Sequence, residues 1–224
     1  MNTTDRNSKI IPHSKSSGYY VVDGISLLPI LEKEIRVDEE VELRRIEPKS
    51  PLVNSVSSIA NDICGISTPP MVTYTIEDAM KKKLKVPNFS RKLEYDGIYG
   101  KPDIITVEGD IIELKSTTRK SPSDLTMCKG SIQSMIYGVL KVMSDKEKVH
   151  YPRLYVAVGY YKRSNDFTAI LNRIEIYTVN IKIEGLSLLN NVMTQYKAEY
   201  ILNKLKSKVI KKHKASIPAI PVRP

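Results

Sequence analysis

The sequence contains no tryptophan, two phenylalanines, two cysteines and three histidines among its 224 residues. Cys64 and Cys128 are far apart in the sequence, and neither belongs to a Cys-x-x-Cys pair or a Cys/His cluster. We therefore expect no structural zinc and no iron–sulfur cluster, and we expect both thiols to act as small buried apolar groups. The histidines, His13, His150 and His213, fall in a predicted tail, a loop and a basic segment, so we expect no catalytic histidine.

Long apolar runs are also missing. No stretch approaches the ~18 to 20 apolar residues of a membrane-spanning helix. The polar N-terminus, MNTTDRNSKIIPHSKSSG, lacks the apolar region of a signal peptide. These features predict a cytoplasmic protein without a membrane segment. The hydrophobic fraction of 41% is enough for a packed core, and the length fits one domain with added terminal segments.

Positive charge is in excess, with 35 Lys and Arg against 25 Asp and Glu and a formal net charge of +10. A basic protein favours a polyanionic partner, nucleic acid first and an anionic membrane second. The segment NKLKSKVIKKHK, residues 203–214, is especially basic. Phosphate binding, a membrane-surface contact and a solvated helix face all remain open for it.

The chain divides into one domain and two terminal segments. Residues 1–17 are rich in Ser, Lys and Asn and predict a flexible tail, and residues 211–224 form a basic, Pro-rich tail. The single domain is expected over 18–210. Within it, residues 19–47 mix apolar residues with dense charge of both signs. Part of this segment alternates as a pair of edge strands would, but a solvated face held by salt bridges is the preferred interpretation.

Apolar spacing and turn residues predict the elements of the domain. Helices are expected at 52–64, from Thr75 through TIEDAMKKKLK with Thr75 as N-cap, over SDLTMCKGSIQSMIYGVLKVMSD with Ser123 or Asp124 as N-cap, and at 186–210. Three short segments of β type are RKLEYDGIYG, KPDIITVEG and DIIELKSTT, and two later strands are RLYVAVGYYK and NRIEIYTVNIKI. This order predicts an α/β fold with a central mixed sheet flanked by helices.

The segment GKPDIITVEGDIIELKST, residues 100–117, carries the residues suited to catalysis. Along its second strand, Glu113 and Lys115 project to one face because side chains alternate. If Asp103 reaches the same face, two carboxylates converge beside one lysine. Hard divalent cations such as Mg²⁺ bind one or two carboxylates together with water and phosphate oxygens. The lysine can orient or deprotonate the attacking water, or offset developing charge, so the group suits phosphodiester hydrolysis.

The turn of this hairpin decides whether the site forms. A two-residue turn at Glu108 and Gly109 would leave Asp103 on the wrong face. A three-residue turn that also includes Asp110 would pair Asp103 with Lys115. We therefore predict a three-residue loop or a bulge, and Gly109 makes either easy. The alternative is a surface hairpin that carries an ordinary ion pair.

This segment resembles the Asp and Glu-x-Lys core of the PD-(D/E)XK nuclease superfamily. Gln133 and Tyr137, in QSMIY, resemble the Gln-x-x-x-Tyr motif of its RecB-like and Cas4-like branch, whose residues line the DNA near the metal. The order of elements over residues 92–160 is similar to the common core of that family. Upstream, SVSSIANDIC resembles the N-terminal helix of Cas4-like proteins. The resemblance covers about residues 74–160.

Two departures from the family pattern matter. Cas4-like members carry four cysteines for an iron–sulfur cluster, whereas only Cys64 lies near such a position here. The branch often has a metal-binding histidine on the first core helix, where this chain has IEDAM. Glu77 is the favoured substitute over Asp78, and a carboxylate there resembles the resolvase-type members. The composition also resembles that of nuclease-like proteins of crenarchaeal viruses, which would place the protein in a host cytoplasm.

The resemblance implies a restriction-endonuclease-like core of order α-β-β-β-α-β. It also implies a Mg²⁺- or Mn²⁺-dependent DNA nuclease of replication, repair or recombination, acting on single-stranded, duplex or branched DNA. Metal would be held by Asp103, Glu113 and Glu77, with Lys115 as the fourth catalytic residue. The resemblance implies that Gln133 and Tyr137 bind substrate. Further candidate substrate-binding residues are Lys101, Ser116, Lys162 and Arg163; the last two end a strand and could contact phosphate, but a plain strand terminus is an equal alternative. A non-catalytic DNA-binding or assembly protein and an RNA-cleaving relative are the alternatives, and a homodimer is left open.

Overall fold

The structure is a computed structural model of the chain. It describes residues 20–22, 24–46, 54–66, 73–145, 151–183, 186–187 and 195–215. The predicted tail at 1–17, the last nine residues of the predicted tail at 211–224, and His13 and His150 lie outside these ranges. Within the described part, no helix is both long and apolar enough to cross a membrane.

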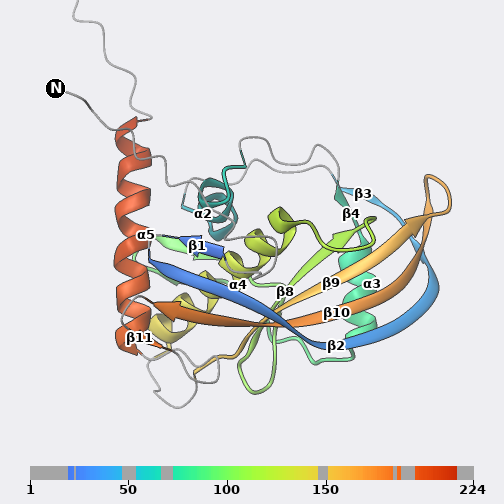
Figure 1. The fold of residues 1–224 in the computed structure, drawn as a ribbon, viewed down its shortest axis with the longest axis horizontal. Helices are drawn as coiled ribbons and strands as arrows, with labels where there is room; N and C mark the ends of the chain where they lie inside the picture. The colour runs from blue at the N-terminus through green and yellow to red at the C-terminus, as the bar shows by residue number, and fades with distance from the viewer. Residues whose placement is uncertain are drawn as a thin grey trace, which may run out of the picture.

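A twisted seven-stranded sheet forms the centre of the molecule (Figure 1). Its order is β1-β2-β10-β9-β8-β7, with β11 paired to β10. The bounds are β1 Tyr20–Val22, β2 Ile25–Glu42, β7 Ile104–Ile105, β8 Ile111–Thr117, β9 Leu154–Arg163, β10 Thr168–Ile183 and β11 Leu186–Ser187. The β8–β9 pair is parallel and the other pairs in the described sheet are antiparallel. The prediction of an α/β fold with a mixed sheet is therefore confirmed.

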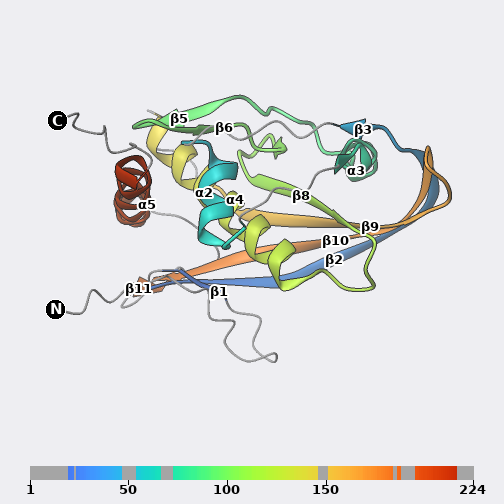
Figure 2. The ribbon, with the colours of Figure 1, turned by 90° about the horizontal axis from the view of Figure 1, so that it is seen from above.

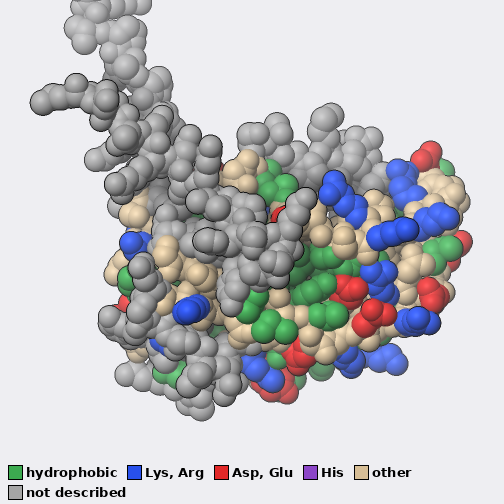
Figure 3. Space-filling view, viewed as in Figure 1, with side chains coloured by type: hydrophobic (Ala, Val, Ile, Leu, Met, Phe, Trp, Pro, Cys, Tyr) green, Lys and Arg blue, Asp and Glu red, His purple; other side chains and the backbone are tan. Residues whose placement is uncertain are grey.

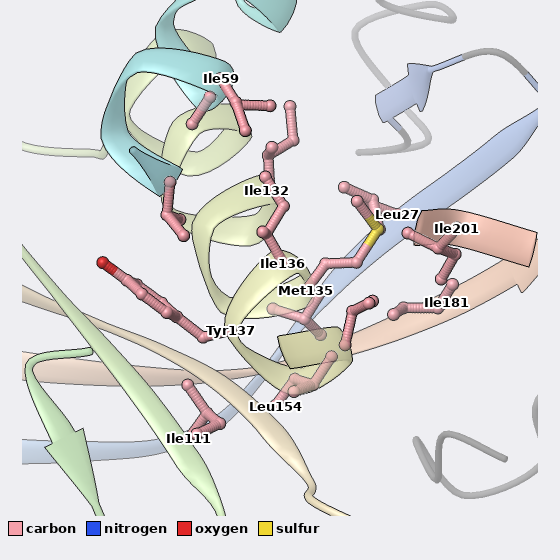
Figure 4. Packing of buried hydrophobic residues seen from close by; sticks show 14 of the residues in the cluster. Leu27, Ile59, Ile111, Ile132, Met135, Ile136, Tyr137, Leu154, Ile181 and Ile201 are labelled. Atoms are coloured by element: carbon pink, nitrogen blue, oxygen red, sulfur yellow. The ribbon is translucent and has the colours of Figure 1, made fainter. Parts of the chain in front are cut away.

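Helices cover both faces of this sheet. They are α2 Val56–Ile63, α3 Ile76–Leu84, α4 Asp124–Ser144 and α5 Gln195–Ala215. Figure 2 shows α2, α4 and α5 together, with α3 apart from them. The larger core joins these three helices to one face of the sheet, where Ile132 and Ile136 of α4 are fully buried (Figure 4). The smaller core packs Ile76 and Met80 of α3 against Leu114 on the opposite face. The sheet thus separates two apolar layers.

Two short hairpins lie outside the central sheet. β5 Leu93–Tyr95 pairs with β6 Ile98–Gly100, and β3 Arg45–Ile46 pairs with β4 Thr73–Tyr74. The segment RKLEYDGIYG was expected to be of β type, and it forms its own two-stranded sheet. Asp96 and Gly97 make its turn with φ of 50° and 78°, the left-handed conformation of a tight two-residue hairpin turn.

The structure corrects the preferred interpretation of residues 19–47. Instead of only a solvated charged face, they contain β2, an 18-residue strand that pairs with β10 along most of its length. Ile25 and Leu27 enter the larger core, and Ile35 and Val37 pack against the smaller one. The charges lie on the exposed side of a strand, because period-two alternation places them away from the apolar positions.

The predicted helix ends are only partly right. The segment from 186 was assigned to a helix, but Leu186 and Ser187 pair with β10, and α5 begins at Gln195 and continues to Ala215. Ser123 caps α4, since its side chain accepts a hydrogen bond from the Thr126 amide at 3.1 Å. Thr75 precedes α3 without a side-chain cap. Its hydroxyl instead accepts from the Arg44 amide at 3.0 Å, which ties α3 to the segment after β2.

Candidate active site

The hairpin of β7 and β8 has a three-residue turn. The Thr106 amide donates to the Asp110 carbonyl at 3.0 Å, and the Gly109 amide donates back to the Thr106 carbonyl. Gly109 has a φ of 86°, which a residue with a side chain rarely adopts. The strand pairs that set the register are Ile104 with Ile112 and Ile105 with Ile111. The predicted loop length is confirmed, but its residues are Val107, Glu108 and Gly109, one position earlier than expected.

This register places Asp103 opposite Glu113 and corrects the predicted pairing with Lys115. A shift of two residues leaves every side chain on its own face, so both carboxylates still lie on the same side of the sheet. Asp103 is held against β8 because its Oδ2 accepts a hydrogen bond from the Leu114 amide at 2.9 Å. The hairpin therefore brings the two carboxylates together.

Glu113 and Lys115 form a buried ion pair beside Asp103. The Lys115 Nζ lies 2.7 Å from the Glu113 Oε1 and donates a second hydrogen bond to the Leu114 carbonyl at 2.8 Å. Glu113 is 3% exposed. Its other oxygen, Oε2, is buried and has no hydrogen-bond partner among the described residues. A carboxylate in this state is costly, because a buried charged oxygen normally has a donor or a cation beside it.

The pKa values reflect a centre with more carboxylates than cations. Burial and the charge of Asp103 raise the pKa of Glu113 to about 8, against the opposing effect of Lys115. Burial alone would lower the pKa of Lys115, but the charges of Glu113, Asp103 and Glu77 outweigh it, and the pKa is raised. The Lys115 ammonium group therefore stays protonated among the three acidic side chains.

Glu77, on α3, faces this centre and its neighbour Asp78 does not. Burial raises the pKa of Glu77, and the charges of Lys115 and Asp103 act on it as well. Asp78 is exposed and lies 3.9 Å from the Lys81 ammonium in an ion pair one turn along the helix. The structure thus favours Glu77 as the third carboxylate.

The residues fit a divalent cation by their chemistry. In the described ranges, no group of three or more His, Cys, Asp and Glu is close enough to hold an ion as it stands. The carboxylates of Asp103, Glu113 and Glu77 nevertheless supply the hard oxygen ligands that Mg²⁺ and Mn²⁺ take. A bound cation would give the Glu113 Oε2 a partner and would offset the burial and the Asp103 charge that raise the pKa of Glu113.

Tyr137 reaches the centre from α4. Burial raises its pKa, and the charges of Glu113 and Asp103 raise it further, whereas a hydrogen bond with the Lys101 backbone lowers it. Gly100 permits this approach, since a Cβ at that position would lie 2.9 Å from the Tyr137 ring. The tyrosine therefore lies near Lys101 and Asp103, in the segment that leads into β7.

Gln133 is buried where α4 meets α2. Its Nε2 donates to the Ser57 Oγ at 3.3 Å, and its Oε1 is buried without a hydrogen-bond partner among the described residues. In this structure Gln133 thus joins two helices, while Tyr137, one turn further along the helix, lies beside the carboxylates.

The other predicted substrate residues are spread more widely. Ser116 pairs with Gly159 and faces away from Glu113 and Lys115, because side chains alternate along β8. Lys101 is exposed just before Asp103. Lys162 and Arg163 lie on the β9–β10 hairpin, roughly 13 Å along β9 from the residue paired with Lys115. The structure therefore brings Lys101 to the site and places Ser116, Lys162 and Arg163 outside it.

Gly130 was missed by sequence reasoning although it sets the distance between α4 and the strands β8 and β9. A Cβ there would lie 2.8 Å from Val156 and 3.4 Å from the Lys115 side chain. A glycine inside a strongly periodic helix was the available signal, since such a residue often marks close packing.

A hydrogen-bond network around the buried Glu175 was also missed. The hydroxyls of Tyr160 and Tyr177 donate to Glu175, whose other oxygen accepts from Arg173 at 2.9 Å. Arg173 stacks over the Tyr160 ring at 3.7 Å and donates to the Lys120 carbonyl at 2.8 Å. The network therefore anchors the loop between β8 and α4. Arg173, Glu175 and Tyr177 alternate along β10, but Tyr160 comes from β9 and Lys120 from a loop, so tertiary structure is needed to bring the network together.

The two cysteines meet although they are distant in the sequence. The sulfur of Cys64, after α2, lies 3.4 Å from the sulfur of Cys128 in α4. Both are free thiols, Cys128 is buried and Cys64 is half-buried against the larger core. They pack as apolar groups, as predicted, but against each other.

Comparisons with protein-family models, curated proteins and solved structures find no match to this chain. Its function is therefore argued from the geometry. Figure 3 shows Lys and Arg side chains interspersed with Asp and Glu at the end of the molecule where β3, β4 and the β9–β10 hairpin lie. The charged side chains on this face are therefore of both signs.

Proposed function

We propose that this chain is a Mg²⁺- or Mn²⁺-dependent nuclease that hydrolyses phosphodiester bonds in DNA. The observation that carries the proposal is the buried, unpartnered Oε2 of Glu113 beside Asp103 and Lys115 on one face of the sheet. A structural ion pair has no need for a second carboxylate and an unpaired oxygen, whereas a cation site needs both.

The arrangement of the elements supports a restriction-endonuclease-like core. Along the chain the order is α3, β5, β6, β7, β8, α4 and β9, which has one strand more than the expected α-β-β-β-α-β order. The parallel β8–β9 pair, with α4 as the connection between them, agrees with that core. The difference is β6, which pairs with β5 in a separate sheet instead of joining β7.

The proposed roles follow from charge and position. Asp103, Glu113 and Glu77 would hold the cation. When bound, it would lower the pKa of a water molecule and polarise the phosphoryl oxygen. Lys115 has a raised pKa, so it acts as a fixed cation that orients the phosphate and offsets negative charge, rather than as the base that deprotonates water.

DNA as the substrate is supported by the charge of the whole chain. The net charge of +10 favours association with a polyanion. Exposed cations lie near the hairpin and the loop after β8, at Lys101, Arg119 and Lys120. They would draw the sugar–phosphate backbone toward a centre that is itself acidic.

The test is cleavage of single-stranded, duplex and branched DNA, and of RNA, with Mg²⁺, Mn²⁺ or EDTA. We expect cleavage that requires the cation, and a loss of about 100-fold or more in Asp103→Ala and Lys115→Ala. Glu199→Ala, in an exposed position of α5, is the control and should cleave like the wild type.

Binding of DNA without cleavage of any substrate would contradict the proposal and favour a non-catalytic DNA-binding protein. Cleavage of RNA alone would reassign the substrate and keep the catalytic centre.

A further inference from the structure

Lys129 lies on the face of α4 that carries Gln133 and Tyr137. The three residues are spaced four apart, so they line one side of the helix. Lys129 is half-buried, and it makes no hydrogen bond or ion pair with any of the described residues. An unpaired ammonium group in a half-buried position is costly, and a methionine would fill the same space without that cost.

The neighbourhood of Lys129 is the proposed catalytic centre. The adjacent Gly130 brings α4 against Lys115 and Val156. Burial lowers the pKa of Lys129, the positive charge of Lys115 lowers it further, and Glu113 and Glu77 oppose both effects. The ammonium group is therefore within electrostatic reach of the ion pair, although no carboxylate is bonded to it.

Lys115 has little hydrogen-bonding capacity left for a phosphate of a nucleic acid strand. Two of the three hydrogens on its ammonium group are already donated, to Glu113 and to the Leu114 carbonyl. No described residue accepts a hydrogen bond from the Lys129 ammonium group. A compact ammonium group with free donors is well suited to a phosphate oxygen, which it binds as a point charge.

We propose that Lys129 is a substrate-binding residue that contacts a phosphate of the bound strand next to the one attacked beside Lys115. This inference rests on the proposed nuclease function, because it concerns the same site. Lys129 would hold the strand along α4, and its contribution is to binding and not to the chemical step.

The test is the binding of a single-stranded oligonucleotide in EDTA, measured by fluorescence anisotropy from about 50 to 200 mM salt. For Lys129→Met we expect affinity to fall about five- to tenfold, and the slope of log K against log salt to shrink by about 0.7, the value of one lost phosphate contact. Lys129→Arg should retain most of the affinity and the slope.

Lys182→Met is the matched control. Lys182 is exposed on β10, and it pairs with Ser26 and Ser187 at the far end of the sheet. It should leave the slope unchanged. Thermal unfolding should show Lys129→Met to be at least as stable as the wild type, because the variant removes an unpaired, half-buried charge.

Unchanged affinity and slope in Lys129→Met would overturn the inference even if the wild type cleaves DNA in an Asp103-dependent way. A reduced slope in a protein that cleaves no substrate would establish the phosphate contact and remove the nuclease assignment.

Discussion

At the scale of single residues, Glu77 and Asp78 are neighbours on α3 that differ in burial and in the charges near them. Glu77 is half-buried near Asp103 and Lys115, whereas Asp78 is exposed beside Lys81. We expect Glu77→Ala to lower divalent-dependent cleavage by about 10-fold or more, and Asp78→Ala to change it less than twofold. Steady-state cleavage rates at saturating Mn²⁺ check this. Equal losses in the two variants would show that Glu77 has no special role.

Gly130 is a second residue for which the close packing around it allows a prediction. In Gly130→Ala the new methyl group would lie 2.8 Å from Val156, so either α4 or β9 must move. We expect the free energy of unfolding to fall by about 1–3 kcal/mol, as in other overpacked cores. Cleavage should fall with it, because the Lys115 side chain shares the contact.

Urea unfolding curves and cleavage rates together check this prediction. Gly97→Ala is a useful comparison, since its new Cβ would meet no atom within 4 Å and only the backbone conformation would be strained. A Gly130→Ala variant with wild-type stability and rate would contradict the close packing.

At the scale of elements, the network around Glu175 joins β9 and β10 to the loop before α4. Burial raises the pKa of Glu175, but hydrogen bonds from Tyr160, Tyr177 and Arg173 outweigh it, and the pKa is lowered from 4.5. A carboxyl with a lowered pKa in the folded state contributes stability above pH 4.5 and loses that contribution as the pH falls through the lowered value.

Glu175→Gln should therefore be less stable than the wild type at pH 7, by about 1–3 kcal/mol, because its amide cannot replace the charged acceptor. The difference should shrink as the pH is lowered below 4.5, since the wild type then loses the same charge. Urea unfolding at a series of pH values checks this. A difference that stays constant down to pH 3 would show that the charge of Glu175 is not what stabilises the loop.

The helices and strands also show which sequence patterns were sufficient to predict secondary structure. The apolar run of β9 and the long periodic pattern of α4 predicted those two elements, because each buries most of its length. For β2 a pair of edge strands was only the second interpretation, because exposed charge dilutes its apolar residues, and pairing with β10 decided its conformation. The β5–β6 hairpin had the correct local pattern, but only packing showed that it does not join the central sheet.

At the scale of the whole molecule, the proposed metal ligands connect the two faces of one sheet. Asp103 and Glu113 lie on the hairpin that contacts both cores, and Glu77 comes from α3. A cation bound to all three should stabilise the folded domain as a unit. At a concentration 100 times Kd the gain is about 2.7 kcal/mol, which corresponds to a rise of roughly 5–10 °C in Tm for a domain of this size.

Thermal unfolding in EDTA and in Mn²⁺ checks the prediction. Glu113→Gln should lose most of the rise in Tm, because an amide replaces a charged ligand. Glu94→Gln, an exposed position on β5, should keep it. A wild-type protein whose Tm does not respond to Mn²⁺ or Mg²⁺ would argue against a cation site.

The sequence by itself determined the α/β class, the position of the β7–β8 hairpin and the odd length of its turn, because alternation and a glycine are local properties. Tertiary structure decided the rest. The register that sets Asp103 opposite Glu113 depends on packing of the whole sheet. The choice of Glu77, the meeting of Cys64 with Cys128 and the position of Lys129 beside Lys115 depend on how distant elements pack, which no local pattern encodes.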